Sequence, residues 1–162
     1  MTTQFLKIGL GLGAMIGAIG LAAAAQAGEC PAASMKADAR ASGETMGKGV
    51  TDNVLGFVEL AKEAPMLQGR KLRIRKLVVQ PGGVVPWHEH GDRPALILTL
   101  EGSITEYRSN CTAPIEHPTG DVAREQGGVA HWWRNNTKKP AVLLSADIKD
   151  DRGEAAAKPD HM

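Results

Sequence analysis

Short apolar runs separated by glycine- or proline-containing turns fill most of the chain between residues 50 and 149. The clearest runs cover 72–79, 95–100 and 141–148, and none is long enough to indicate an amphipathic helix. Turns recur about every eight to twelve residues, a spacing typical of small all-β domains. The pattern therefore predicts roughly six to eight short strands, folded as a β-barrel or jelly roll.

The remaining residues divide the chain further. Its 162 residues suffice for one domain with a sizeable core. Residues 28–49 are rich in Ala, Ser, Gly and charge without an apolar period, which predicts a poorly ordered lead-in. We expect the barrel to span residues 50–149 and a flexible charged tail to follow over 150–162.

The first 27 residues have the composition of a signal peptide. Lys7 supplies a positive start, residues 8–25 carry no charge, and Ala25-Gln26-Ala27 offers a small-x-small cleavage site. A retained membrane anchor is the alternative, because the uncharged stretch is just long enough to span a bilayer. Cleavage after Ala27 predicts a periplasmic or secreted protein without stable membrane insertion.

The charge balance argues against nucleic acid as a partner. Removing the signal peptide leaves 18 basic against 18 acidic residues, so the mature chain lacks the basic excess of a nucleic-acid binder. Lys71, Arg73, Arg75 and Lys76 do cluster. On a strand, such a run is typical of a solvated face or a guarded sheet edge.

Three histidines form the candidate site. His88 and His90 are two residues apart, so on an extended strand both imidazoles leave the same face. His131 follows the Gly127-Gly128 turn in a later strand-like run, from which a neighbouring strand would supply a third ligand. Converging imidazoles suit a divalent transition metal, whereas three hydrogen-bonded core histidines are the alternative.

The residues around these histidines resemble the two motifs of the cupin family. In the first motif a glycine precedes His-x-His by five residues and a second glycine closes the motif, as Gly82, His88, His90 and Gly102 do. The second motif is matched by Gly120, Gly128, His131 and Asn135. The resemblance runs from Gly82 to Asn135 and implies the cupin double-stranded β-helix, a jelly-roll barrel.

Two positions depart from the family pattern. Ala95, or Pro94 in the shorter spacing, stands where the family has a metal-binding glutamate, and Gln126 replaces a proline. Glu89 should point away from the two histidines, and Asp92 lies in a turn. The resemblance therefore implies a site of His88, His90 and His131 without a carboxylate, open to iron, zinc, manganese, nickel or copper.

A small-molecule ligand is the expected partner of this site. Trp133 shares parity with His131 and should face the barrel interior, as a pocket wall or as core packing. Ala95, Ile97 and Thr99 follow one another at period two and are candidates for lining the same cavity. Two copies of a cupin often associate through a strand edge or barrel face, which makes a homodimer a further expectation.

Cys30 and Cys111 are the two cysteines of the chain. In an oxidising compartment they are expected to form a disulfide that ties the mature N-terminus to the domain, although two unpaired thiols remain the alternative. Their separation in space cannot be obtained from the sequence.

Two functions compete. An open metal site with an apolar wall resembles that of cupin dioxygenases, which implies an iron-dependent oxidoreductase acting on a small chelating or aromatic substrate. A non-catalytic periplasmic module that binds a metal or small ligand is the alternative, because fold does not decide function. A sugar isomerase or epimerase is disfavoured, since it needs a positioned base and none is recognisable beside the histidines. The catalytic residues remain unassigned.

Overall fold

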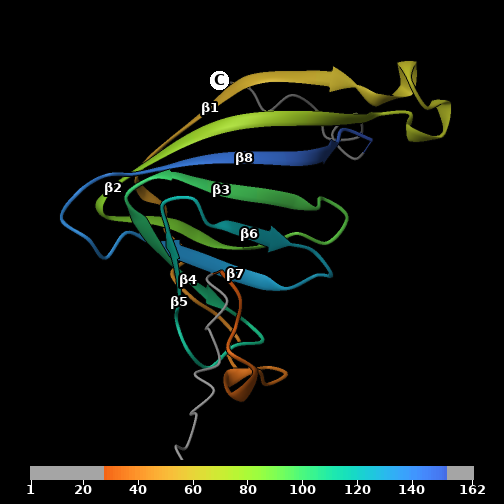
Figure 1. Cartoon of the computed structure of the whole chain (residues 1–162). Coiled ribbons are helices and arrows are strands. Elements are labelled where there is room, and N and C mark those ends of the chain that lie inside the picture. The colour runs from red at the N-terminus through yellow and green to blue at the C-terminus, as the bar shows by residue number, and fades with distance from the viewer. Residues whose placement is uncertain (1–27, 153–162) are drawn as a thin grey trace, which may run out of the picture.

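The computed structural model describes residues 28–152, which form a nearly closed antiparallel β-barrel (Figure 1). The strand order is β5-β4-β7-β2-β8-β3-β6, and β1 pairs with β2 beside this path. The predicted all-β jelly-roll class is thus confirmed. The strands are β1 (Lys48–Glu59), β2 (Arg70–Glu89), β3 (Ala95–Glu101), β4 (Ser103–Arg108), β5 (Ile115–Pro118), β6 (Val122–Glu125), β7 (Ala130–Arg134) and β8 (Ala141–Asp150).

Helical structure within the described range is limited to three single 3₁₀ turns. They are η1 (Ala32–Ser34), η2 (Leu60–Lys62) and η3 (Pro65–Leu67). No helix within residues 28–152 is long and apolar enough to cross a membrane. The predicted signal peptide, residues 1–27, lies outside the described residues.

Strand β2 links the barrel wall to the site. Its first half, 70–79, pairs with both β1 and β8, and its second half pairs with β7. The sequence predicts a turn at Pro81-Gly82-Gly83, but the strand bends there without ending. Gly82 has a φ of +71°, and a Cβ on Gly83 would lie 2.8 Å from a backbone oxygen. Glycine thus permits the bend that brings His88 to the barrel interior.

The core fills the barrel between the two halves of the sheet. Over residues 95–99 of β3 and 141–147 of β8 every second side chain is buried, as the period of a strand facing a core requires, and Leu77 and Val79 of β2 follow the same period. The cluster consists of Leu77, Val79, Ile97, Ile104, Ala123, Trp133, Ala141 and Leu143. Trp133 is the largest of these side chains and is 1% exposed, so it faces inward as its parity predicts.

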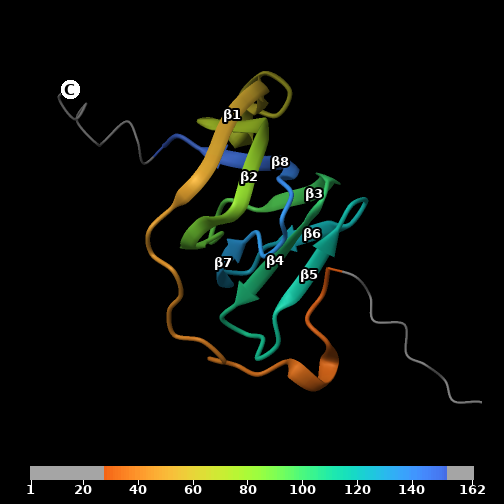
Figure 2. The same cartoon turned by 90° about the vertical axis from the view of Figure 1, so that its left-hand side faces the viewer.

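The basic run of β2 does not form only a solvated face. Arg73 and Arg75 share the parity of the core residue Leu77, and both pair with the buried carboxylate of Asp147 on β8. Lys71 instead pairs with Glu59 and Asp151 near the edge of the β1–β2 hairpin, which projects beyond the barrel (Figures 1 and 2). Two of the four basic side chains are therefore partly buried beside β8.

The segment before β1 runs along the end of the barrel past β4 and β5 (Figure 2). Backbone hydrogen bonds attach it there, from Lys36 N–H to the Asn110 carbonyl and from Thr112 N–H to the Ser34 carbonyl. Cys30 and Cys111 form a disulfide with a Cα–Cα distance of 5.8 Å. The predicted disulfide is confirmed, and it fixes residue 30 beside the end of β4.

Candidate metal centre

Four side chains converge inside the barrel. His88, His90, Glu125 and His131 each offer one ligand atom, and these atoms lie within 4.8 Å of one another. His88 is half-buried and the other three are buried. The structure thus brings the three predicted histidines together and adds a carboxylate to them.

Strand pairing explains the convergence. His88 on β2 is the register partner of His131 on β7, so both imidazoles leave the same face of the ladder. His90 follows two residues after His88 and keeps its parity. Glu125 ends β6, where it faces Ala95 of β3 across an antiparallel pair.

The predicted absence of a carboxylate at this centre is wrong. Position 95 of β3 is alanine, but its cross-strand partner Glu125 directs a carboxylate to the same region. The carboxylate is therefore carried by β6 instead of β3, at the residue that pairs directly with position 95. Glu89 is exposed, as predicted, and Asp92 is also exposed.

Hydrogen bonds set the tautomers of the histidines. Nδ1 of His88 lies 2.8 Å from the Pro86 carbonyl, and Nδ1 of His90 lies 2.8 Å from the Arg93 carbonyl. A carbonyl oxygen only accepts, so both Nδ1 atoms carry the hydrogen. Nδ1 of His131 lies 2.5 Å from Oε1 of Glu106, where a carboxylate is the acceptor. In the neutral form of each ring, Nε2 therefore presents a lone pair to the centre.

The facing atoms at the centre lie close together. Nε2 of His88 and His90 are 3.0 Å apart, and Oε2 of Glu125 is 2.7 Å from Nε2 of His90. Both carboxylate oxygens of Glu125 and Nε2 of His131 are buried without a hydrogen-bond partner. Since donors about 2.1 Å from one ion are separated by about 3 Å, these spacings fit a shared divalent metal.

Electrostatics also favour a cation at this position. Burial, followed by the neighbouring His131, lowers the pKa of His88 to about 4, so this imidazole is neutral at pH 7. Glu125 brings a buried carboxyl group to the same centre, and an uncompensated buried charge is costly. A divalent ion would satisfy the carboxylate and the three lone pairs together.

Glu106 holds His131 in place and is itself surrounded by His117 and Arg108. Burial acts to raise the pKa of Glu106, but hydrogen bonds from His117 and His131 and the charge of Arg108 outweigh it and hold the pKa below its usual range. Glu106 is therefore an anion that accepts from Nδ1 of His131, and such an acceptor orients a metal-binding imidazole and raises its basicity. His117 in turn lies 2.7 Å from Asp121.

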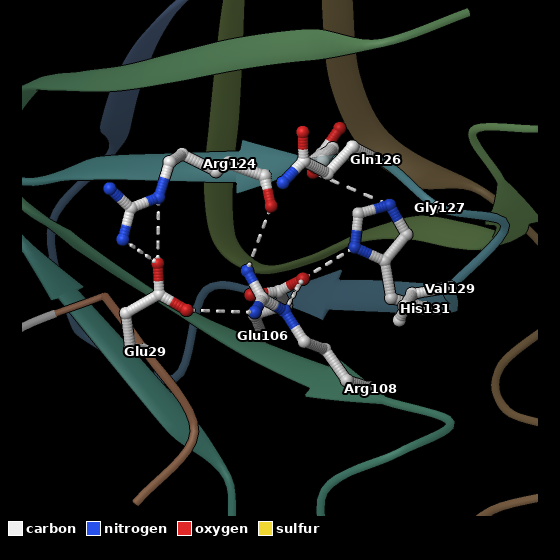
Figure 3. Close-up of a pocket in the computed structure, with 9 residues that line it drawn as sticks. Glu29, Glu106, Arg108, Arg124, Gln126, Gly127, Val129 and His131 are labelled. Carbon is white, nitrogen blue, oxygen red and sulfur yellow. Dashed lines mark hydrogen bonds and ion pairs between the residues drawn. The ribbon is translucent and has the colours of Figure 1, made fainter. Parts of the chain in front are cut away.

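Two cavities reach the four-donor cluster. The first has a volume of about 260 Å³ and touches His88, His90 and Glu125. Six apolar residues form most of its other walls: Leu77, Val85, Pro86, Ile97, Trp133 and Leu143. Three charged residues complete them: Asp52, Arg75 and Arg93. The second cavity, about 560 Å³, touches His131 and Glu125 from another side (Figure 3).

The four residues predicted to line one cavity do not all do so in the structure. Trp133 and Ile97 line the first cavity. Ala95 lies beside Glu125 but opens to a different pocket, formed with Pro94, Leu96 and β8. Thr99 is 1% exposed and lines none of these cavities.

Glu125 and Glu106 are the site residues that the sequence reasoning missed. Ala123 and Glu125 alternate at period two before the Gly127-Gly128 turn, which was a signal for a strand with an inward carboxylate. Glu106 follows Ile104 at the same period, in a strand whose direction could not be fixed across Gly102. In both cases the sequence does not show how the strand that carries the glutamate pairs with its neighbours in the barrel.

Comparisons with known proteins agree with this architecture. A family model described as a cupin domain matches residues 75–147, which include all four donors. The crystal structure of a predicted oxalate decarboxylase from Thermotoga maritima aligns with a TM-score of 0.51 at 22% identity, over 74% of this chain and 97% of that one. The cupin domain of Cnp3 from Schizosaccharomyces pombe aligns with a TM-score of 0.51 at 12% identity, over 70% and 74%. Among curated proteins, none matches the sequence.

Proposed function

This chain belongs to the cupin superfamily, and we propose that it binds a divalent transition metal through Nε2 of His88, His90 and His131 and the carboxylate of Glu125. One observation carries the proposal: three imidazoles and a carboxylate converge, with one possible ligand atom from each lying within 4.8 Å of the others, and Nε2 of His131 and both Glu125 oxygens have no hydrogen-bond partner. A neutral histidine with a purely structural role would donate a hydrogen bond from one ring nitrogen and accept one at the other, from protein groups or from solvent.

The donor set narrows the choice of metal. Three imidazoles suit zinc, copper, nickel or iron, and a carboxylate oxygen adds the harder ligand that manganese and iron accept readily. Because the ligands carry one negative charge in total, a divalent ion would retain one positive charge. We therefore propose iron for an oxidoreductase, with manganese next.

The finer proposal is a dioxygenase-type oxidoreductase acting on a small chelating or aromatic substrate. A bound ion would supply Lewis acidity toward oxygen ligands of the substrate. The side chains of Ile97, Trp133 and Leu143 form the apolar part of the first cavity and would exclude water around a ring. Arg75 and Arg93 border the same cavity and would attract an anionic end of the substrate.

A non-catalytic periplasmic binding module is the second candidate. The charged groups bordering the first cavity already have partners, because Arg75 pairs with Asp52 and Arg93 pairs with Asp147. Apart from the cluster itself, the first cavity therefore borders no unpaired carboxylate among the described residues. A module of this kind would retain metal or ligand through purification without turnover.

The metal-binding proposal is tested by elemental analysis of protein that is purified from the periplasm with no metal added. We expect about one equivalent of a transition metal in the natural protein and its loss in His131→Ala and Glu125→Ala. Glu89→Gln is the matched control, because Glu89 lies between two of the donors in sequence but is exposed. Unchanged metal content in both site variants would refute the assignment.

Oxygen uptake separates the two functions. Iron-loaded protein would be assayed with catechols, diketones and flavonols. Oxalate, suggested by the predicted activity of the Thermotoga protein, would be followed by release of carbon dioxide, because its decarboxylation consumes no oxygen. Substrate-dependent uptake that is lost in Glu125→Ala supports the oxidoreductase. A tightly bound small molecule found by mass spectrometry, without uptake, supports the binding module.

We also propose that the protein is exported after cleavage behind Ala27. The apolar start of the chain and the Cys30–Cys111 disulfide both suit an oxidising compartment. Intact-mass measurement of the periplasmic protein should give a chain that begins at Gly28. A cytoplasmic protein that keeps residues 1–27 would contradict this proposal.

A further inference from the structure

Glu29 places a carboxylate between two arginines at the mouth of the second cavity (Figure 3). Its Oε1 accepts a hydrogen bond from Nε of Arg124 at 3.0 Å and another from Nη2 of the same side chain. Its Oε2 accepts from Nη1 of Arg108 at 3.4 Å. The two guanidinium groups thus bind the two oxygens of one carboxylate.

This contact is exchangeable with solvent. The Arg124 side chain is 61% exposed and that of Glu29 is 32% exposed, and ion pairs of such exposure contribute little to stability. The segment that carries Glu29 is held by the Cys30–Cys111 disulfide and by backbone hydrogen bonds further along. The Glu29 carboxylate can therefore leave the arginines without releasing the segment.

The arginines line a cavity that continues to the four-donor cluster. Arg108 is mostly buried, donates to Glu106 at 2.8 Å and donates to the Arg124 carbonyl at 3.3 Å. The cavity that the two arginines line has a volume of about 560 Å³, and His131 and Glu125 line it as well. A small molecule bound to the arginines would therefore share its cavity with two members of the cluster.

We propose that Arg108 and Arg124 form a binding site for small carboxylate ligands and that Glu29 occupies it in this structure. A free carboxylate would make the same hydrogen bonds that Glu29 makes, and its remaining atoms would extend into the cavity. The site depends on the arginine pair alone, so it exists whether or not the cluster binds a metal.

The disulfide gives Glu29 its advantage over a free ligand. Cys30 is adjacent to Glu29, and its bond to Cys111 keeps the Glu29 carboxylate at a high local concentration beside the arginines. A free carboxylate must compete with this tethered group. Binding to the natural protein should therefore be weak, and removal of the Glu29 side chain should strengthen it.

Propionate reproduces the end of a glutamate side chain and is the probe of choice. It would be titrated into ¹⁵N-labelled protein, both as purified and after zinc loading, while the Nε–Hε signals of Arg108 and Arg124 are followed by NMR. We expect Glu29→Ala to bind propionate at least about tenfold more tightly than the natural protein, with saturable shifts at both arginines. Glu29→Gln should fall between the two.

Glu44→Ala is the matched control, since Glu44 is exposed in the same N-terminal segment and remote from the arginines' cavity. It should bind as the natural protein does. Propionamide, which lacks the charge, should cause no saturable shift, and Glu29→Ala/Arg124→Gln should lose the gain. Equal affinity for propionate in Glu29→Ala and the natural protein would overturn the proposal, as would a gain that survives Arg124→Gln.

Discussion

Ala95 and Glu125 are register partners in the β3–β6 ladder, so the methyl group of one lies beside the buried carboxylate of the other. Directly opposed residues of an antiparallel pair have Cβ atoms about 5 Å apart. The carboxylate that the cupin motif places on the strand of residue 95 is here carried by the adjacent strand. The centre therefore contains a carboxylate although its motif position is alanine.

This relationship predicts that the carboxylate can be exchanged between the two strands. Glu125→Ala should weaken metal affinity more than about 100-fold, beyond the loss typical of outer-shell changes. Ala95→Glu combined with Glu125→Ala should recover part of that affinity, because a side chain from position 95 leaves the same face of the sheet. Competition with a chromogenic chelator would measure both variants.

Ala95→Glu alone should bind metal no better than the natural protein, because two neighbouring buried carboxylates repel each other. Glu89→Gln serves as the control for loss of an acid in the same motif. If the double variant binds as weakly as Glu125→Ala, the two positions are not equivalent around the metal.

The fold and the histidine ligands follow from local patterns. Period-two alternation and glycine-rich turns predict a β-barrel, and the His88-x-His90 spacing places two imidazoles on one face. Neither inference needs to know which strands are neighbours. The motif surrounding His131 supplies its place in the same site by resemblance.

The carboxylate was missed because it depends on a pairing between distant residues. Ala95 and Glu125 are thirty positions apart, and only the register of β3 against β6 brings them together. Arg73 and Arg75 show the same limit, since a basic run on a strand predicts a solvated face until Asp147 is found opposite. The period-two pattern of a strand shows which of its side chains share a face, but it does not show which distant strand lies beside it.

Glu106 should control metal affinity without contacting the metal. Glu106→Gln keeps the shape of the side chain but removes the charge that accepts from Nδ1 of His131. Loss of such an acceptor typically costs about 10–100-fold in metal affinity. Chelator competition would measure this loss, and a shift in the spectrum of the cobalt-loaded protein would report the altered histidine.

Glu116→Gln is the control for Glu106→Gln, because Glu116 lies on β5 beside β4 and contacts hydroxyl groups rather than the histidines. Its metal affinity and cobalt spectrum should match those of the natural protein. An unaltered cobalt spectrum in Glu106→Gln would show that Glu106 serves packing alone.

The disulfide should contribute to stability through the length of chain that it closes. Cys30 and Cys111 are 81 residues apart, and removing a native disulfide from a small exported domain costs about 2–5 kcal/mol. Cys30→Ser/Cys111→Ser should lower the free energy of unfolding by this amount in urea. The natural protein under reducing conditions should unfold at the same urea concentration as the variant; a higher midpoint would mean that the serines disturb the native state.

Ala95 has a second acidic register partner, Asp147 of β8, on the strand opposite to that of Glu125. Asp147 accepts hydrogen bonds from Arg73 and Arg93. Burial acts to raise the pKa of Asp147, but the hydrogen bonds from Arg73 and Arg93 and the charge of Arg75 outweigh it and hold the pKa below its ordinary value. The folded state therefore binds the proton of Asp147 less tightly than the unfolded state does.

Asp147→Asn should destabilise the protein at neutral pH and much less in acid. A carboxyl group with a depressed folded pKa stabilises the fold above its unfolded pKa of about 3.9, and this contribution disappears as the pH falls through the lower folded pKa. At pH 7 the loss should be about 3 kcal/mol, because the variant leaves arginines without their buried partner. Urea unfolding at pH 7 and pH 3 would measure the narrowing gap, and Glu101→Gln, at an exposed position, should show none. A gap that stays constant between the two pH values would mean that Asp147 is not held as an anion by these arginines.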